Sequence, residues 1–284
     1  MHTAILYALL SLFFAGINDL VFKRYSVRDR SRGMLIFGIG LVWALLQGVL
    51  MQARHTGFQI DAASLGYGLA AGVALTLSNL LLIEGLTHVE VSLGSTIYRL
   101  NTIGVVILSV LFLHEGLGPI KGLGITCGIV AILLLARHPP GGIDRQLHRL
   151  FVWLVIAASL LRALYGVITK AALNQGADAD SLMLIAALCW VVGGAAYARF
   201  REGRFGMSRK KAAYALVSGL LVTLIVNFLV EAVARGEASV VIPVANLSFV
   251  AALLLSVAIG WERLTLKKVG AVGAAVVSIW LLAQ

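Results

Sequence analysis

The sequence predicts an all-α integral membrane protein with ten transmembrane helices, arranged as two inverted five-helix repeats. Hydrophobic residues make up 60% of its 284 residues and only 13% are charged. A soluble chain of this length has too little interior to bury that much apolar side chain. In addition, residues 84–121 align without gaps with residues 231–268, an offset of 147 residues at which ten of 38 positions are identical.

Continuous apolar runs of about 20 residues predict the helices, because this length crosses the hydrocarbon core of a bilayer. The runs lie near 3–22, 33–51, 63–84, 91–113, 119–136, 150–170, 180–198, 212–231, 239–260 and 266–283. They do not alternate, and they are too long for the ~10-residue strands of a membrane barrel.

The segment 138–149 contains two prolines followed by two glycines, a composition typical of a linker. It divides the chain into a first repeat at 1–137 and a second at 150–284. Each repeat holds five spans, so two similar copies must enter the membrane in opposite orientations. Inverted repeats of this kind are typical of secondary transporters.

The distribution of basic residues predicts the orientation. Of the 23 Lys and Arg residues, 17 fall in odd-numbered loops, four in the opposite loops and two inside spans. The positive-inside rule therefore places the odd loops in the cytoplasm and both termini outside it. We expect a multi-pass protein of the inner (plasma) membrane whose +10 net charge faces the lipid bilayer rather than a nucleic acid.

Charged residues inside the spans are the first candidates for substrate binding. Arg99 lies ~12 Å inside the fourth span and Arg162 near the middle of the sixth. Since an arginine fork matches a carboxylate or phosphate, we predict that Arg99 and Arg162 receive an anionic group of the substrate. Alternatively, either arginine pairs with Asp19, the one acidic residue well inside a span. Asp19 and Glu84 are also candidates for proton coupling.

Other polar and aromatic residues at membrane depth complete the predicted cavity. The polar candidates are Asn18, Asn79, Thr96, Tyr98, Tyr165, Asn227 and Asn246. Trp43 and Trp190 are 147 residues apart and either flank the cavity or pack against other helices. Pro243 is a candidate hinge, because proline removes a backbone donor from the ninth span.

No motif for metal binding, ATP binding or hydrolase chemistry is present in the sequence, so we expect neither a cofactor nor an enzyme. Glycines in spans five and ten allow close helix packing; they are Gly122, Gly124, Gly128, Gly270 and Gly273. The sequence leaves open whether the protein is a monomer or a homodimer through these two spans.

The chain resembles the drug/metabolite transporter superfamily, specifically its EamA-type ten-helix exporters, over essentially its whole length. The most specific stretch is 237–273, which contains Pro243 in the ninth span, Glu262 after it and a glycine-bearing tenth span. The first repeat departs from the family pattern with Thr96 where proline is common and with Arg99. The resemblance implies alternating access between two five-helix bundles, with spans 1, 3, 4, 6, 8 and 9 around a central cavity.

Together, these features predict a secondary active transporter that exports a small carboxylate-bearing metabolite, an amino acid or a relative, by alternating access. One alternative is a nucleotide-sugar or lipid-linked-sugar translocator, in which two arginines would bind phosphate. Another is a membrane scaffold without transport, in which Asp19, Arg99 and Arg162 would satisfy one another without a cavity.

Overall fold

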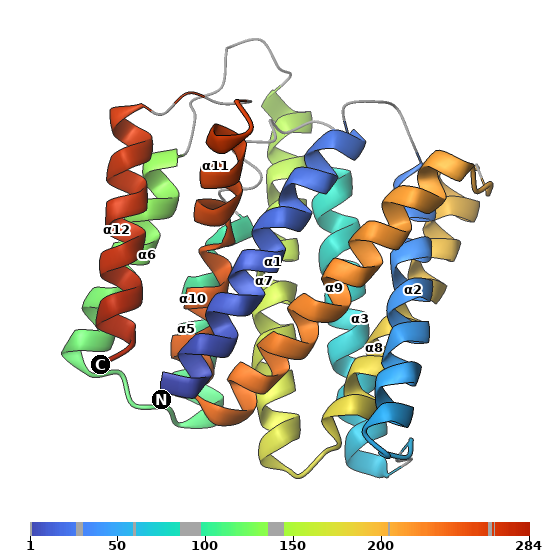
Figure 1. Cartoon of the computed structure of the whole chain (residues 1–284), viewed down its shortest axis with the longest axis horizontal. Helices are drawn as coiled ribbons and strands as arrows, with labels where there is room; N and C mark the ends of the chain where they lie inside the picture. Colours follow the sequence, from blue (N-terminus) through green and yellow to red (C-terminus); the bar gives the residue numbers. More distant parts are fainter. Residues whose placement is uncertain are drawn as a thin grey trace.

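The computed structural model describes residues 2–26, 31–58, 61–85, 98–135, 145–203, 205–260, 263 and 265–284, and in these residues the chain forms helices and no strand. Each of these helices overlaps a predicted span, and α10 and α11 share one. Figure 1 shows how the helices are arranged. The helices are α1 (His2–Ser26), α2 (Arg32–Ala53), α3 (Ala62–Gly85), α5 (Asn101–Leu113), α6 (Pro119–Leu135), α7 (Arg145–Asn174), α8 (Ala179–Ala196) continued by η1 (Tyr197–Arg201), α9 (Arg209–Arg235), α10 (Ala238–Asn246), α11 (Ser248–Ala258) and α12 (Leu266–Leu282).

Within the described residues, seven helical segments are long and apolar enough to cross a membrane, and α10 together with α11 counts as one of them. The residues Asn101–Leu113 and Pro119–Leu134 form shorter apolar helices. The all-helical membrane fold is therefore confirmed, whereas the count of ten spans stays a prediction. In addition, α7 begins at Arg145, so the last residues of the segment expected as a linker are helical.

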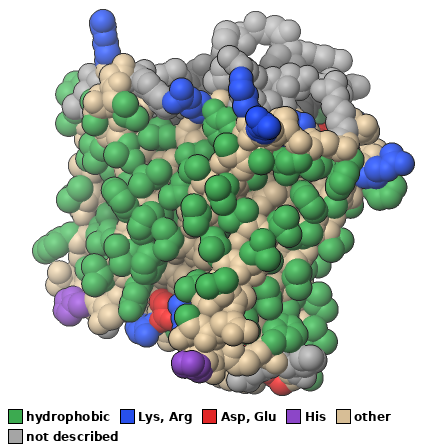
Figure 2. Space-filling view, turned by 45° about the vertical axis from the view of Figure 1, so that its right-hand side comes forward, with side chains coloured by type: hydrophobic (Ala, Val, Ile, Leu, Met, Phe, Trp, Pro, Cys, Tyr) green, Lys and Arg blue, Asp and Glu red, His purple; other side chains and the backbone are tan. Residues whose placement is uncertain are grey.

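The surface matches a membrane environment. Apolar side chains cover the middle of the molecule, and most of the visible Lys and Arg side chains lie near one end (Figure 2). Large exposed hydrophobic residues occur along α2, α3, α5, α6 and α12. Lipid chains can cover such a surface without the cost that water would impose.

Helices of the two halves are interleaved rather than separated into two bundles. Among the described helices, the most extensive packing joins α3 with α7, α2 with α8, α1 with α9, and α6 with α12. Each of these pairs takes one helix from each half. The contacts also follow a two-fold pattern, because α1 packs on α9 as α7 packs on α3.

Matching helices of the two repeats run antiparallel. Glu202, which follows η1, accepts a hydrogen bond from the Arg32 backbone N–H at the beginning of α2 (2.8 Å). At the other end of the pair, Gln47 in α2 donates to Asp180 at the beginning of α8 (2.9 Å). Antiparallel packing of equivalent helices is the arrangement that inverted repeats require.

Glycines of α6 make the α6–α12 contact inside the chain. A Cβ added at Gly124 would lie 2.9 Å from Leu282, and one at Gly128 would lie 3.0 Å from Ser278 Oγ. The Ser278 hydroxyl also donates to the Gly124 carbonyl (2.7 Å). These two glycines, predicted as part of a homodimer seam, are therefore covered by α12, and the oligomeric state stays a prediction.

Candidate functional site

Two helix breaks lie at equivalent positions of the repeats. Leu247 separates α10 from α11, and Leu100 directly precedes α5. Their backbone angles are similar, with φ −77° and ψ 14° at Leu247 and φ −68° and ψ 0° at Leu100. A break inside a membrane exposes backbone polar groups, which need partners from neighbouring helices.

Arg99 lies beside the first break and binds groups at the second. Its guanidinium donates to the Asn246 carbonyl (3.1 Å) and to Ser248 Oγ (3.0 Å). It also donates to Asp19 Oδ2 (2.7 Å) and lies 5.4 Å from the centre of the Phe249 ring. Asp19 therefore pairs with Arg99 rather than with Arg162, and Arg99 already has an anion and two neutral acceptors.

The side chain of Asn246, in the second repeat, in turn binds residues of the first repeat. Its Nδ2 donates to Asn101 Oδ1 (2.6 Å) and to Thr102 Oγ1 (3.1 Å). Since Asn246 is the equivalent of Arg99 at the 147-residue offset, the two breaks hold each other through hydrogen bonds in both directions.

A cavity of about 70 Å³ lies next to this junction. Its described lining comes from α1, α7, α9, α10 and α11, which correspond to predicted spans 1, 6, 8 and 9. The lining residues are Ser11, Ala15, Arg162, Tyr165, Gly166, Ile225, Leu229, Ile242, Ala245, Asn246 and Ser248. Asn246 and Ser248 therefore bind Arg99 and also line the cavity.

Arg162 differs from Arg99 in its partners. It lies near the middle of the apolar segment Arg149–Asn174 and lines the cavity. Its guanidinium lies 5.4 Å from the centre of the Tyr165 ring, a cation–π distance. In the described part of the chain no side chain or carbonyl forms a hydrogen bond or ion pair with it. Arg162 is thus a cation at membrane depth that can bind an anion in the cavity.

Several predicted site residues lie outside the described cavity lining. Asn79 donates to the Leu75 carbonyl of its own helix (2.8 Å). The Tyr98 hydroxyl lies 3.2 Å from Ser78 Oγ. Asn18 is buried, and its Oδ1 has no hydrogen-bond partner among the described residues. Thr96 lies outside the described residues.

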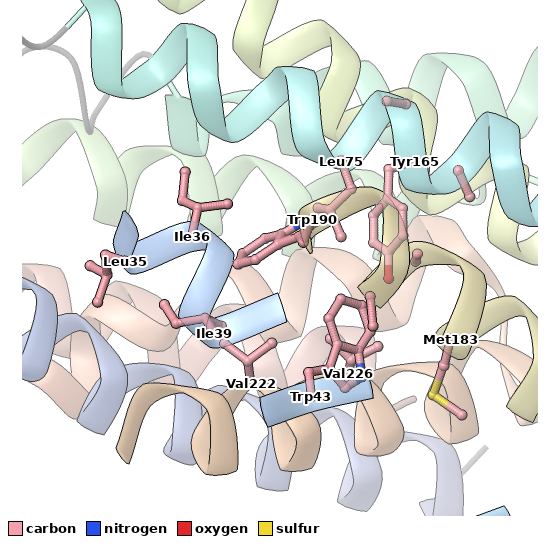
Figure 3. Close-up of a cluster of buried hydrophobic side chains, with 14 of the residues drawn as sticks. Leu35, Ile36, Ile39, Trp43, Leu75, Tyr165, Met183, Trp190, Val222 and Val226 are labelled. Carbon is pink, nitrogen blue, oxygen red and sulfur yellow. The ribbon is translucent and has the colours of Figure 1, made fainter. Parts of the chain in front are cut away.

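Trp43 and Trp190 pack against each other. Their ring centres are 6.0 Å apart in an edge-to-face arrangement, inside a hydrophobic cluster of α2, α3, α7, α8 and α9 (Figure 3). Tyr165 belongs to this cluster and also lines the cavity. The two indoles therefore support one cavity residue and are not part of the described lining themselves.

Asn227 belongs to a buried polar network between α2, α8 and α9. Asp180, at the beginning of α8, accepts hydrogen bonds from Gln47 (2.9 Å), Arg54 (2.6 Å) and Thr56 (3.0 Å). Asn227 donates to Gln47 Oε1 (3.0 Å) and accepts from Arg54 (3.3 Å). Sequence reasoning missed Asp180 as a partner, because it lies at a predicted span end where a charged residue needs no special explanation.

Glu84 and Glu115 bind groups at helix ends. Glu84 accepts from the Tyr197 hydroxyl (2.6 Å) and from Arg201 Nε (3.0 Å) at the end of α3, away from the cavity lining. Glu115 accepts from the backbone N–H groups of Ala238 and Ser239, both at 2.8 Å. Glu115 therefore caps α10. Glu84 pairs with side chains instead, and its predicted role in proton coupling stays a prediction.

Chemically, the described residues of the site can bind a small anion. The described residues contain no group of three or more His, Cys, Asp or Glu side chains that could hold a metal ion. Among the described lining residues, the polar groups are one guanidinium without a hydrogen bond or ion pair, three hydroxyls and one amide, and the remaining walls are apolar. Such a site can bind a ligand and fix its orientation.

Comparison with known proteins identifies a family. A family model described as the EamA-like transporter family matches residues 2–137 and again residues 149–284. The crystal structure of a protein, described without an activity, has the same fold with a TM-score of 0.85 and 13% sequence identity, covering 99% of this chain and 96% of its own. No curated protein matches the sequence.

Proposed function

Because the chain belongs to the EamA-like transporter family, we propose that it exports a small carboxylate-bearing metabolite across the inner membrane by alternating access. The observation that carries this proposal is the guanidinium of Arg162, which faces a cavity at membrane depth without a hydrogen bond or ion pair in the described chain. A cation in this position costs roughly 2.5–3.5 kcal/mol on the insertion scale. A bound anion would offset that cost.

Arg162 is a better candidate than Arg99 for the carboxylate site. Arg99 donates to Asp19, Asn246 and Ser248, so a substrate would have to displace one of these partners. Arg162 would instead gain its first charged partner, and the Tyr165 ring would hold its guanidinium plane in place. We assign Arg99 the role of holding the two helix breaks together.

The alternatives receive less support from this arrangement. A sugar-phosphate translocator would use both arginines to bind phosphate, and the fork of Arg99 is engaged by Asp19. A scaffold without transport would have Arg162 satisfied by the protein and would have no cavity beside it. The first description does not fit the contacts of Arg99, and the second does not fit those of Arg162.

Transport measurements test the proposal directly. The purified protein, reconstituted in proteoliposomes, should exchange one or more small carboxylates from a metabolite panel. Arg162→Gln should raise the KM of that exchange by about 10- to 100-fold, because a charge-assisted hydrogen bond contributes about 1.5–3 kcal/mol. Arg162→Lys, which keeps the charge, should lose less.

Arg209→Gln is the matched control, because Arg209 is exposed at the beginning of α9 and distant in sequence from the cavity residues. It should transport like the unaltered protein. Unchanged transport of every carboxylate by Arg162→Gln would remove Arg162 as the binding site. Absence of carboxylate transport by the unaltered protein would overturn the proposed substrate class.

A further inference from the structure

We propose that the cavity selects small monocarboxylates that carry no ammonium group, such as 2-oxo and 2-hydroxy acids, over zwitterionic amino acids. The inference deepens the proposed function and rests on it, because it takes Arg162 as the carboxylate site.

Among the described residues, the charges at the junction leave one positive charge for the substrate. Asp19 and Arg99 form an ion pair with a 2.7 Å contact, so their charges offset each other. Arg162 is the remaining charged side chain of the described cavity lining. A monoanion neutralises this site, whereas a zwitterion brings a carboxylate and an additional positive charge.

An ammonium group would find no anionic acceptor among the described lining residues. Among the described lining residues there is no Asp or Glu. The Asn246 carbonyl and the Ser248 hydroxyl both accept hydrogen bonds from Arg99. The Ser11 hydroxyl donates to the Ile225 carbonyl (2.9 Å), and these two oxygens keep acceptor lone pairs but carry no charge. Moving an ammonium ion from water into a site without a counter-charge is unfavourable.

The remaining walls are apolar and the space is small. Ala15, Ile225, Leu229, Ile242 and Ala245 line the cavity of about 70 Å³. Ile242 also packs closely against α7 at Gly166, because a Cβ at this position would lie 2.6 Å from Ile242 Cδ1. These walls suit a short aliphatic chain attached to the carboxylate.

Matched substrate pairs test this selectivity. For carbon chains of three to six atoms, the 2-oxo acid, the 2-hydroxy acid and the L-amino acid are compared in proteoliposome exchange and in ligand-induced thermal stabilisation of the detergent-solubilised protein. We expect the oxo and hydroxy acids to be preferred over the amino acid by about tenfold or more at each preferred length. This preference should require Arg162, with Arg162→Gln as the comparison.

The results separate the two proposals. Amino-acid transport that depends on Arg162 and equals or exceeds that of the oxo acid in every pair would overturn this inference and leave the proposed function intact. Absence of Arg162-dependent transport or stabilisation for all pairs would overturn both. Loss of amino-acid transport alone in Asp19→Asn would identify Asp19 as an ammonium site, which also contradicts the inference.

The balance of charges at the junction leads to a second, independent prediction for the Asp19→Asn variant. The substitution keeps the shape of the side chain and leaves Arg99 without its anionic partner. The junction then carries two positive charges, so transport of C3–C4 dicarboxylates should rise relative to monocarboxylates. An unchanged ratio, measured on a variant with normal folding by size-exclusion chromatography, would contradict the charge count.

Discussion

Arg99 connects three segments that are far apart in the sequence. It binds Asp19 on α1, and it binds Asn246 and Ser248 on either side of the α10–α11 break. Both charged partners are partly exposed, with side-chain exposures of 22% for Arg99 and 37% for Asp19. The pair should therefore contribute less than a fully buried ion pair, but its loss leaves one charge unmatched at membrane depth.

A double-mutant cycle measures this contribution. Asp19→Ala and Arg99→Ala should each lower the free energy of unfolding by about 1–3 kcal/mol, with the larger loss for Arg99→Ala because it also removes the contacts to Asn246 and Ser248. The double variant should cost less than the sum of the two. Unfolding of the detergent-solubilised protein by denaturant provides the measurement. Additive losses would show that Asp19 and Arg99 are not energetically coupled.

The charged residues of the junction could be predicted from the sequence, but their pairing could not. Arg99, Arg162 and Asp19 stand out because ionisable groups are rare within apolar spans. Asp19 and Arg99 are 80 residues apart, and the choice between Arg99 and Arg162 as the partner depends on how the helices pack. Ser11 and Ser248 are even harder to recognise as cavity residues from the sequence, since short hydroxyl side chains are common in membrane helices.

At the level of single elements, α10 is notable because charged groups from the first repeat bind both of its ends. Glu115 accepts from two N–H groups at its beginning, and Arg99 donates to the Asn246 carbonyl at its end. An anion at the first turn and a cation at the last both complement the helix dipole. A nine-residue helix is too short to be stable alone, so these contacts should keep α10 ordered.

Glu115→Ala should therefore loosen α10 locally. Two backbone donors lose their acceptor, and hydrogen–deuterium exchange of peptides covering 237–246 should accelerate by about tenfold, as expected for the loss of ~1.4 kcal/mol of local stability. Glu202→Ala is the matched control, because Glu202 binds the beginning of α2 in the same way. It should accelerate exchange at 32–36 and leave α10 unchanged. Equal exchange of α10 in Glu115→Ala and the unaltered protein would contradict the capping role.

The two helix breaks differ in how well they can be predicted from the sequence. Pro243 in the ninth span indicates a weakened helix, although the break itself lies four residues later at Leu247. No proline marks Leu100, and the apolar run at 91–113 predicts a continuous fourth span. The break at Leu100 depends on partners such as Asn246, which appear only once the repeats are packed together.

Across the whole molecule, duplication was evident from the sequence, but interleaving was not. The offset of 147 residues shows which helices are equivalent and that they must be inverted. It does not show that α1 packs on α9 or α3 on α7, because such contacts depend on shape rather than on similarity between the halves. The interleaved packing means that neither half has a separate core, so we expect the two halves to unfold together.

The orientation of the molecule in the membrane remains to be tested, and the structure offers two matched positions for doing so. Gly57, between α2 and α3, and Gly206, before α9, are both exposed and have no atom within 4 Å of an added Cβ. In a background lacking Cys127 and Cys189, we predict that Gly57→Cys reacts with a membrane-impermeant maleimide in intact cells. Gly206→Cys should react only after permeabilisation, because it lies in a basic loop that the positive-inside rule places in the cytoplasm. A reporter fused at Gln284 should accordingly report a non-cytoplasmic C-terminus. The reverse labelling pattern would invert the orientation, and labelling of both positions in intact cells would show that the chain inserts in both directions.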